Sequence, residues 1–325
     1  MQRVALVCAL LVTAGVQPVV AQQRAGGAAA PRRTEADARA AAERNRAERA
    51  RQRQQTGQPV ELISDYMKAV LTPIPQSLDV DRTFYKKHVD AMGIPVIASE
   101  KVPDAALFVA RDIINTMLAM RPDLRKSMVE RKWRTGVIAE VEMTMDIPEY
   151  SRMKRPGAPP GEPVNQEDRD YHANRSRGLG GNPTTGAEEN LLGYPNTRYW
   201  GEHIFVHEFA HAIMTAIRNV DPAMHAEIRA AYDSAMAAGK YISAPERRHY
   251  ATTNAGEYWA EGVQRWFFSN YGECFKGNIK VETPEEFAAY DPKLNELISR
   301  VFNTHHIPMD VFHGKRIRPV ACPAG

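Results

Sequence analysis

Residues 204–213 read IFVHEFAHAI and form the most informative pattern in this chain of 325 residues. Residues four apart lie on one face of a helix, so the imidazoles of His207 and His211 can converge on a single metal ion. Glu208 is rotated by about 100° from His207 and can reach a water molecule without taking a ligand position. A chain of this length and composition is expected to contain only about 0.04 chance matches to the pattern. We therefore predict a metal-binding helix within Tyr199 to Val220, in preference to two hydrogen-bonded core histidines.

Further metal ligands must come from outside the motif, because a catalytic zinc usually has three protein ligands and one open position. A histidine six residues after His211 is excluded, since that position is Ile217. A glutamate nineteen residues after His211 is excluded as well, since that position is Ala230. His203 lies one turn before the motif on the same stripe. We interpret His203 as a residue of the helix end or of the second shell rather than as a ligand.

A second helix predicted over Asn254 to Phe268 carries two carboxylates four residues apart, Glu257 and Glu261. They share a face flanked by large apolar residues, which places acids where they need a partner. Spacing alone permits either to bind the metal. The competing interpretation is that Asn254 caps the helix and Glu257 completes a capping box.

The motif followed by YATTNAGEYWAE at residues 250–261 resembles the gluzincin metallopeptidases of the anthrax lethal factor and Mlc titration factor A type. The resemblance implies a zincin-like fold in which zinc is held by His207, His211 and Glu257. It also implies that Glu208 is the general base and that Tyr250 assists at the reacting carbonyl. Glu261 would then accept a hydrogen bond from a ligand imidazole or pair with a nearby cation. The resemblance covers only Tyr199 to Phe268, so it does not transfer a substrate.

The order of predicted elements indicates an α+β fold of two lobes, with a small sheet and helices first and a mainly helical second lobe. Amphipathic spacing begins at Asp104 and continues to Leu118. Residues 153–183 are rich in Pro and Gly and are expected to be loops, and helices dominate after Tyr194. The remaining elements are helices over Leu62 to Val70 and Asp81 to Met92, and strands over Val96 to Ser99 and Gly136 to Met145.

The N-terminus is typical of an export signal. Arg3 precedes an apolar stretch, and a small-residue cleavage site ends at Ala21, so residues 1–21 are predicted to be a signal peptide and the protein to be secreted or periplasmic. No later apolar run is long enough to span a membrane. Residues 22–58 lack large apolar side chains, and Gln23 to Gln58 carry a net charge of +5. We expect this stretch to be a disordered or loosely helical spacer, and residues 59–325 to be the metallopeptidase domain.

Two cysteines, Cys274 and Cys322, remain after signal removal, and an even count in an exported chain predicts a disulfide that fastens the C-terminal tail to a helix end. The alternative is two separate thiols.

These features together predict an exported zinc metallopeptidase in which Glu208 deprotonates a zinc-activated water that attacks a peptide or protein substrate. The segment from Asn182 to Leu192 is expected to supply a sheet edge for that substrate, a lid or a plain loop. One alternative is a non-catalytic secreted zinc-binding module. Another is an arginine-rich binder of surfaces or nucleic acid, which the absence of interleaved aromatic residues disfavours. The pattern does not set the oligomeric state.

Overall fold

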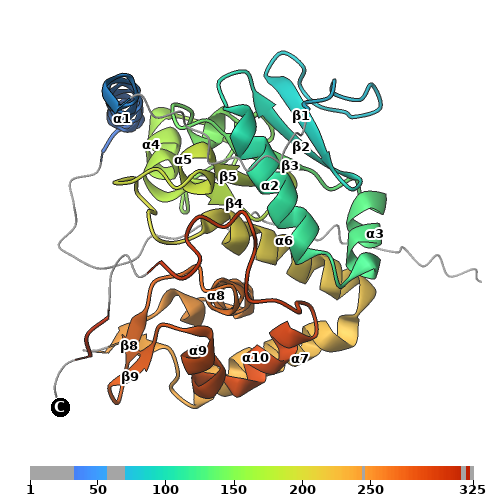
Figure 1. The fold of residues 1–325 in the computed structure, drawn as a ribbon, viewed down its shortest axis with the longest axis vertical. Coiled ribbons are helices and arrows are strands. Elements are labelled where there is room, and N and C mark those ends of the chain that lie inside the picture. Colours follow the sequence, from blue (N-terminus) through green and yellow to red (C-terminus); the bar gives the residue numbers. More distant parts are fainter. Residues whose placement is uncertain (1–32, 57–69, 244–245, 316–319, 323–325) are drawn as a thin grey trace, which may run out of the picture.

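The computed structural model describes residues 33–56, 70–243, 246–315 and 320–322. The predicted signal peptide lies outside these ranges, and so does the predicted helix over Leu62 to Val70 apart from its last residue. The described residues form ten helices and two small sheets, so the predicted α+β class is confirmed. The larger sheet lies in the upper half of Figure 1, and the lower half is mainly helical.

The larger sheet has five strands in the order β1-β2-β3-β5-β4. The inner strands β2, β3 and β5 are parallel, whereas β1 and β4 run antiparallel at the two edges. The helices α2 and α3 connect β2 to β3. The bounds of these elements are β1 Tyr85–Ala91, β2 Ile94–Ser99, α2 Asp104–Met117, α3 Pro122–Glu130, β3 Thr135–Ile138, β4 Gly178–Leu179 and β5 Thr184–Ala187.

The prediction of a helix over Asp81 to Met92 is wrong, because β1 occupies most of that range and pairs with β2 as a hairpin. Met92 and Gly93 form the turn with positive φ angles of 53° and 94°. Two consecutive residues of positive φ match the right-handed twist of a two-residue hairpin. Gly93 therefore reverses a strand and does not end a helix.

The strand predicted over Gly136 to Met145 is shorter than expected, because β3 ends at Ile138 and Thr144–Asp146 forms a 3₁₀ turn. Where the strand ends, side chains form hydrogen bonds with the amide and the carbonyl of Ala139 in place of a neighbouring strand. The Glu142 carboxylate accepts from the amide of Ala139 at 3.0 Å, and Arg177 donates to the carbonyl of Ala139 at 3.0 Å.

Other predicted elements of the first half are confirmed. The strand over Val96 to Ser99 lies within β2, and α2 buries Leu107, Ile113, Ile114 and Met117 completely. Burying a side chain of this kind contributes roughly 1.5–3 kcal/mol. The loop-rich region 153–183 contains one unexpected helix, α4 (Gln166–Arg175), which Asn165 and Asp168 begin with a capping box.

The predominance of helices after Tyr194 is confirmed. Two short strand pairs interrupt them and join into a second sheet of order β7-β6-β8-β9. The bounds are α5 Glu188–Leu191, α6 Ile204–Val220, α7 Pro222–Ala237, β6 Ile242–Ser243, β7 Arg247–Arg248, α8 Ala255–Trp266, β8 Glu273–Phe275, β9 Ile279–Val281, α9 Pro284–Tyr290 and α10 Pro292–Ser299.

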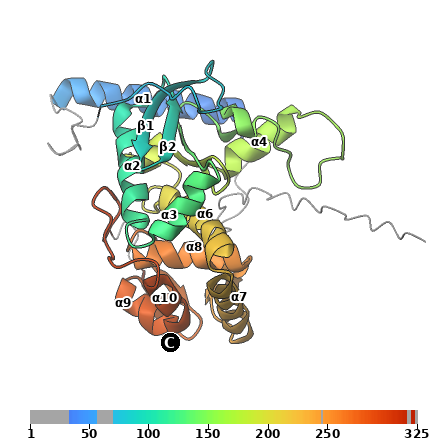
Figure 2. The same cartoon turned by 90° about the vertical axis from the view of Figure 1, so that its right-hand side faces the viewer.

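Part of the arginine-rich N-terminal segment forms the helix α1 (Glu35–Thr56), which lies across the top of the molecule in Figure 2. Its described contacts with the rest of the chain include ion pairs, hydrogen bonds to backbone carbonyls and a cation–π contact of Arg49 with Tyr194. Arg39 pairs with Asp146 at 2.7 Å, Arg49 pairs with the buried Glu140, and Arg46 lies 3.7 Å from the buried Glu188. The segment is therefore held by ionic and polar contacts rather than by an apolar core.

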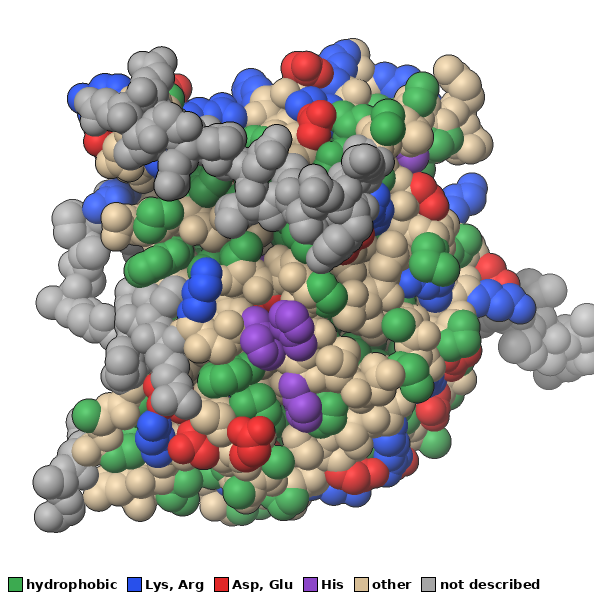
Figure 3. Space-filling view, viewed as in Figure 1, with side chains coloured by type: hydrophobic (Ala, Val, Ile, Leu, Met, Phe, Trp, Pro, Cys, Tyr) green, Lys and Arg blue, Asp and Glu red, His purple; other side chains and the backbone are tan. Residues whose placement is uncertain are grey.

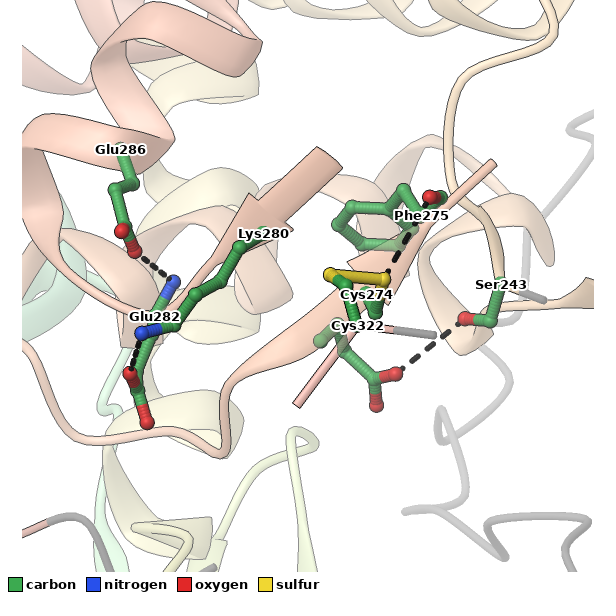
Figure 4. Close-up of a disulfide and its surroundings, with 8 residues drawn as sticks. Ser243, Cys274, Phe275, Lys280, Glu282, Glu286 and Cys322 are labelled. Carbon is green, nitrogen blue, oxygen red and sulfur yellow. Dashed lines mark hydrogen bonds and ion pairs between the residues drawn. A yellow bond between two sulfur atoms is a disulfide. The ribbon is translucent and has the colours of Figure 1, made fainter. Parts of the chain in front are cut away.

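The predicted disulfide is present between Cys274 and Cys322, whose Cα atoms are 5.4 Å apart. Figure 4 shows that Cys274 lies on β8 of the second sheet, close to Phe275. The C-terminal tail is therefore fastened to a strand, and not to a helix end as expected.

The segment after α10 crosses in front of α8 in Figure 1, and histidine side chains gather near the centre of the same face in Figure 3. His305 and His313 in this segment hydrogen-bond through Nδ1 to the carbonyls of Trp266 and Phe267 at 2.9 and 2.8 Å. These bonds cover carbonyls at the C-terminal end of α8. No helix in the described part of the chain combines the length and apolar character needed to cross a membrane.

Candidate metal centre

The helix α6 begins at Ile204, and His203 is its N-cap residue. The Nδ1 atom of His203 accepts a hydrogen bond from the amide of Val206 at 3.4 Å, which satisfies one of the free amides of the first turn. Apolar side chains surround the helix, with Phe205 and Phe209 both fully buried. The predicted helix-end role of His203 agrees with this geometry.

The helix α8 lies directly below α6 in Figure 1 and brings the second set of predicted residues to the motif. Asn254 caps it by accepting from the amides of Gly256 and Glu257 at 2.8 and 3.0 Å. The Trp259 indole donates to the carbonyl of Ala210 at 3.0 Å and fixes the two helices against each other. The predicted cap is present, but the Glu257 carboxylate turns toward the α6 histidines.

Three donor atoms meet between the helices. The Nε2 atom of His207 lies 3.0 Å from Oε2 of Glu257 and 3.2 Å from Nε2 of His211, and the His211 to Glu257 distance is 3.3 Å. Zinc bonds of about 2.0–2.1 Å place the ligands of a tetrahedral ion about 3.3 Å apart. The spacing and the two-imidazole, one-carboxylate donor set therefore fit zinc.

Gln264 fixes the tautomer of His207. The amide nitrogen of Gln264 donates to the carbonyl of His203 at 3.0 Å, so its oxygen faces Nδ1 of His207 at 3.1 Å. Asn270 donates to the same oxygen at 3.0 Å. The His207 Nδ1 must therefore carry a proton and donate it, which leaves Nε2 directed at Glu257 and His211 as a ligand needs.

The same three donors stabilise one another electrostatically. Burial opposes a charge on His207, but its contact with Glu257 outweighs burial and raises the pKa of His207 to about 10. Burial also opposes the Glu257 carboxylate, but His211 and His207 lower the pKa of Glu257 to about 2. The Glu257 carboxylate therefore keeps its charge in this buried position, as a metal ligand requires.

Glu208 lies beside this cluster without a described hydrogen-bond partner. Its side chain is 0 % exposed, and neither carboxylate oxygen meets a donor among the described residues. Burial raises the pKa of Glu208 to about 8, although His207 acts in the opposite direction. An unpartnered buried carboxyl is costly, and a site that brings a cation and a water molecule to it removes that cost. This orphaned group is a second observation that fits a metal site.

Tyr250 begins a 3₁₀ turn before α8, and its hydroxyl donates to Oε1 of Glu257 at 3.2 Å. Burial, followed by the carboxyls of Glu257 and Glu208, raises the pKa of Tyr250 well above its ordinary value. The hydroxyl therefore remains a hydrogen-bond donor at neutral pH, next to the predicted ligand set.

Glu261 lies further from the donors than Glu257. Its carboxylate accepts from Asn270 at 2.8 Å and lies 3.8 Å from His249. The described bond from the His207 imidazole goes to Gln264, so Glu261 supports that ring indirectly, through Asn270. Gln264 and Asn270 were missed in the sequence analysis. The sequence feature that could have identified Gln264 is its spacing. It lies seven residues after Glu257, which places its polar side chain on the same face of α8.

A second group of buried donors comprises Glu202, Glu261 and His207. Glu202 accepts from the Gln264 amide at 3.5 Å and Glu261 accepts from Asn270 at 2.8 Å, and Gln264 and Asn270 meet at the oxygen that faces His207 Nδ1. Gln264 already engages that nitrogen, so this group offers His207 to a metal only if the Gln264 bond breaks.

Glycines let the sheet approach the motif closely. A Cβ atom on Gly178 of β4 would lie 3.0 Å from Cγ of Glu208, and one on Gly180 would lie 2.6 Å from Cβ of His211. The edge strand beside the site is thus β4. The segment from Asn182 to Leu192, expected to supply an edge, a lid or a plain loop, instead contains the inner strand β5 and the short helix α5.

Comparison with known proteins gives no relative. No protein-family model matches the chain, and no curated protein or solved structure is significantly similar to it. The function must therefore be inferred from the site itself.

Proposed function

We propose that this protein is a zinc-dependent metallopeptidase with a zincin-like arrangement of two lobes on either side of α6 and α8. The observation that carries the proposal is the convergence of His207, His211 and Glu257 within 3.0–3.3 Å, beside the orphaned carboxyl of Glu208. When bound, zinc supplies Lewis acidity that lowers the pKa of water and polarises a carbonyl oxygen.

The protein groups perform the proton transfers in this proposal. Glu208 accepts a proton as the water oxygen bonds to the peptide carbonyl carbon, and returns it to the amine as the C–N bond breaks. Tyr250 donates a hydrogen bond to the developing oxyanion. The backbone of an extended substrate pairs with β4, the sheet edge nearest to Glu208.

A non-catalytic zinc module is the main alternative from another class. A structural zinc site has four protein ligands and needs no unpartnered acid beside it. The three-donor set and the orphaned Glu208 therefore favour catalysis. Binding of nucleic acid through the arginine-rich segment is disfavoured further, because Arg39, Arg46 and Arg49 of α1 are paired with carboxylates of the same chain.

The test uses the protein that begins at Gln22. Its metal content is measured, and a peptide library is incubated with it to detect cleavage. We expect about one zinc per chain, cleavage of library peptides, and loss of cleavage after chelation with recovery on zinc addition. A protein that holds zinc and cleaves no peptide would support the structural module instead.

A further inference from the structure

A cavity of about 430 Å³ lies beside the candidate metal centre and is not used by the chemistry described above. Thr215, one helical turn after His211, forms part of its wall. Gly181, which follows the glycine packed against His211, forms another part. The lining residues are Trp133, Glu149, Tyr150, Arg152, Met153, Gly181, Asn182 and Thr215.

The aromatic walls of the cavity are fixed by hydrogen bonds at their polar ends. The Trp133 indole donates to the Thr184 hydroxyl at 2.9 Å, and the Tyr150 hydroxyl donates to the carbonyl of Pro183. Asn182 accepts from the amide of Arg134 at 3.0 Å, which holds the turn between β4 and β5. Because these polar atoms are engaged with the protein, the remaining surface of the two rings is apolar and preorganised.

The charges around the cavity are unequal. Glu149 pairs with Arg134 at 2.8 Å and accepts from the Tyr85 hydroxyl at 2.7 Å, so its charge is balanced. Arg152 is exposed, and the described residues show no ion pair for it. The cavity therefore presents an apolar interior with a cation at its rim, which disfavours a lysine or arginine side chain.

We propose that this cavity binds an aromatic side chain of the peptide substrate. Thr215 lies one helical turn, about 5.4 Å, from His211, and an extended peptide advances about 3.3 Å per residue, so the bound side chain belongs to a residue close to the cleaved bond. Two aromatic rings and a methionine make the pocket complementary to Phe, Tyr or Trp. The inference rests on the proposed peptidase function and adds the class of side chain that the site selects.

Binding of labelled peptides to a Glu208→Gln variant tests the pocket without requiring turnover. Each peptide consists of Ala and Ser and carries one test residue, Phe, Leu, Ala or Lys. The test residue is placed at each position of the peptide in turn, and fluorescence anisotropy gives the Kd. We expect the best Phe peptide to bind about tenfold or more tightly than the Ala peptide, with Leu between them and Lys weakest. Equal binding of the Phe and Ala peptides at every place would overturn the proposal.

Filling the cavity provides the matched variant. Thr215→Trp should abolish the preference for Phe, whereas Val220→Trp, at the exposed end of the same helix, should keep it. Met153→Trp fills the cavity from a loop and serves if Thr215→Trp does not fold. A preference for Phe that survives in the folded filling variant would refute the assignment. Failure of the parent to cleave any peptide would instead refute the peptidase function, so the two failures are distinguishable.

Discussion

The Nδ1 atom of His207 donates a hydrogen bond of 3.1 Å to the side-chain oxygen of Gln264, which commits the opposite ring nitrogen to the cluster with Glu257. Outer partners of this kind orient ligand imidazoles and raise their basicity. The relationship makes Gln264 part of the proposed site, although it touches none of the predicted donor atoms.

Replacing Gln264 by leucine should weaken zinc affinity by roughly 10–100-fold, the usual cost of losing an outer-shell partner. Gln264→Glu keeps the acceptor for His207 Nδ1 but loses the donor to the His203 carbonyl, so it should retain more of the affinity than Gln264→Leu and less than the parent. Competition with a zinc-binding dye measures both variants. Equal affinity of Gln264→Leu and the parent would show that the bond to His207 does not support the ligand.

Glu257 and Glu261 lie one turn apart on α8, and the structure gives them different neighbours. Glu257→Ala should lose zinc and activity together, because its carboxylate completes the donor set. Glu261→Ala should keep zinc with an affinity reduced by at most about 10–100-fold, because it acts through Asn270. Zinc content after dialysis distinguishes them, and the reverse result would move the ligand by one helical turn.

The buried carboxyl of Asp310 should make the free energy of unfolding depend on pH. Burial raises the pKa of Asp310 to about 7, and burial lowers the pKa of its neighbour His203 to about 3. The folded protein thus keeps the Asp310 proton between about pH 4 and pH 7 while the unfolded chain loses it. The extra proton that the folded protein holds on Asp310 stabilises it below about pH 4. As the pH rises from about 4 to about 7, the free energy of unfolding falls by at most about 1.4 kcal/mol per pH unit.

Asp310→Asn should remove that loss while preserving the acceptor for the amide of Phe312. Urea unfolding at pH 5 and pH 8 should show the variant gaining stability relative to the parent as the pH rises. A variant that becomes relatively less stable at pH 8 would mean that Asp310 is charged and paired with His203.

The helix α1 gives a prediction about stability without an effect on the site. Arg49 pairs with Glu140 and lies 4.1 Å from the centre of the Tyr194 ring. Arg49→Ala should cost about 1–3 kcal/mol in the free energy of unfolding, because Glu140 is left buried without its cation. Zinc content and turnover should not change. The exposed Arg44→Ala is the control, and equal stability of the two variants would contradict the docking of α1.

The sequence predicted which donor residues meet between α6 and α8 better than it predicted the strands beside them. His207, Glu208, His211 and Glu257 stand out because helical spacing is local and places donors on one face. The β1 hairpin was missed because its identity depends on pairing with β2, and Gly93 is compatible with a helix end as well as a turn. Gln264 was missed because its role appears only once α6 and α8 are packed together.

The cavity beside Thr215 illustrates the same limit. Its walls come from segments before β3, after β3, between β4 and β5, and on α6, which no sequence spacing connects. The hydrogen bonds of Trp133 and Tyr150 that fix those walls also join segments about 30–50 residues apart. Such a site follows from packing and not from a motif.

Zinc content and turnover of the parent and Glu208→Gln, measured side by side on the peptides that the parent cleaves, test the central claim most directly. Glutamine preserves the shape of Glu208 but cannot accept the proton from water. The account predicts about one zinc per chain in both proteins and a turnover reduced by about 10²–10⁴-fold in the variant. A Glu208→Gln protein that binds zinc and cleaves as fast as the parent would contradict it.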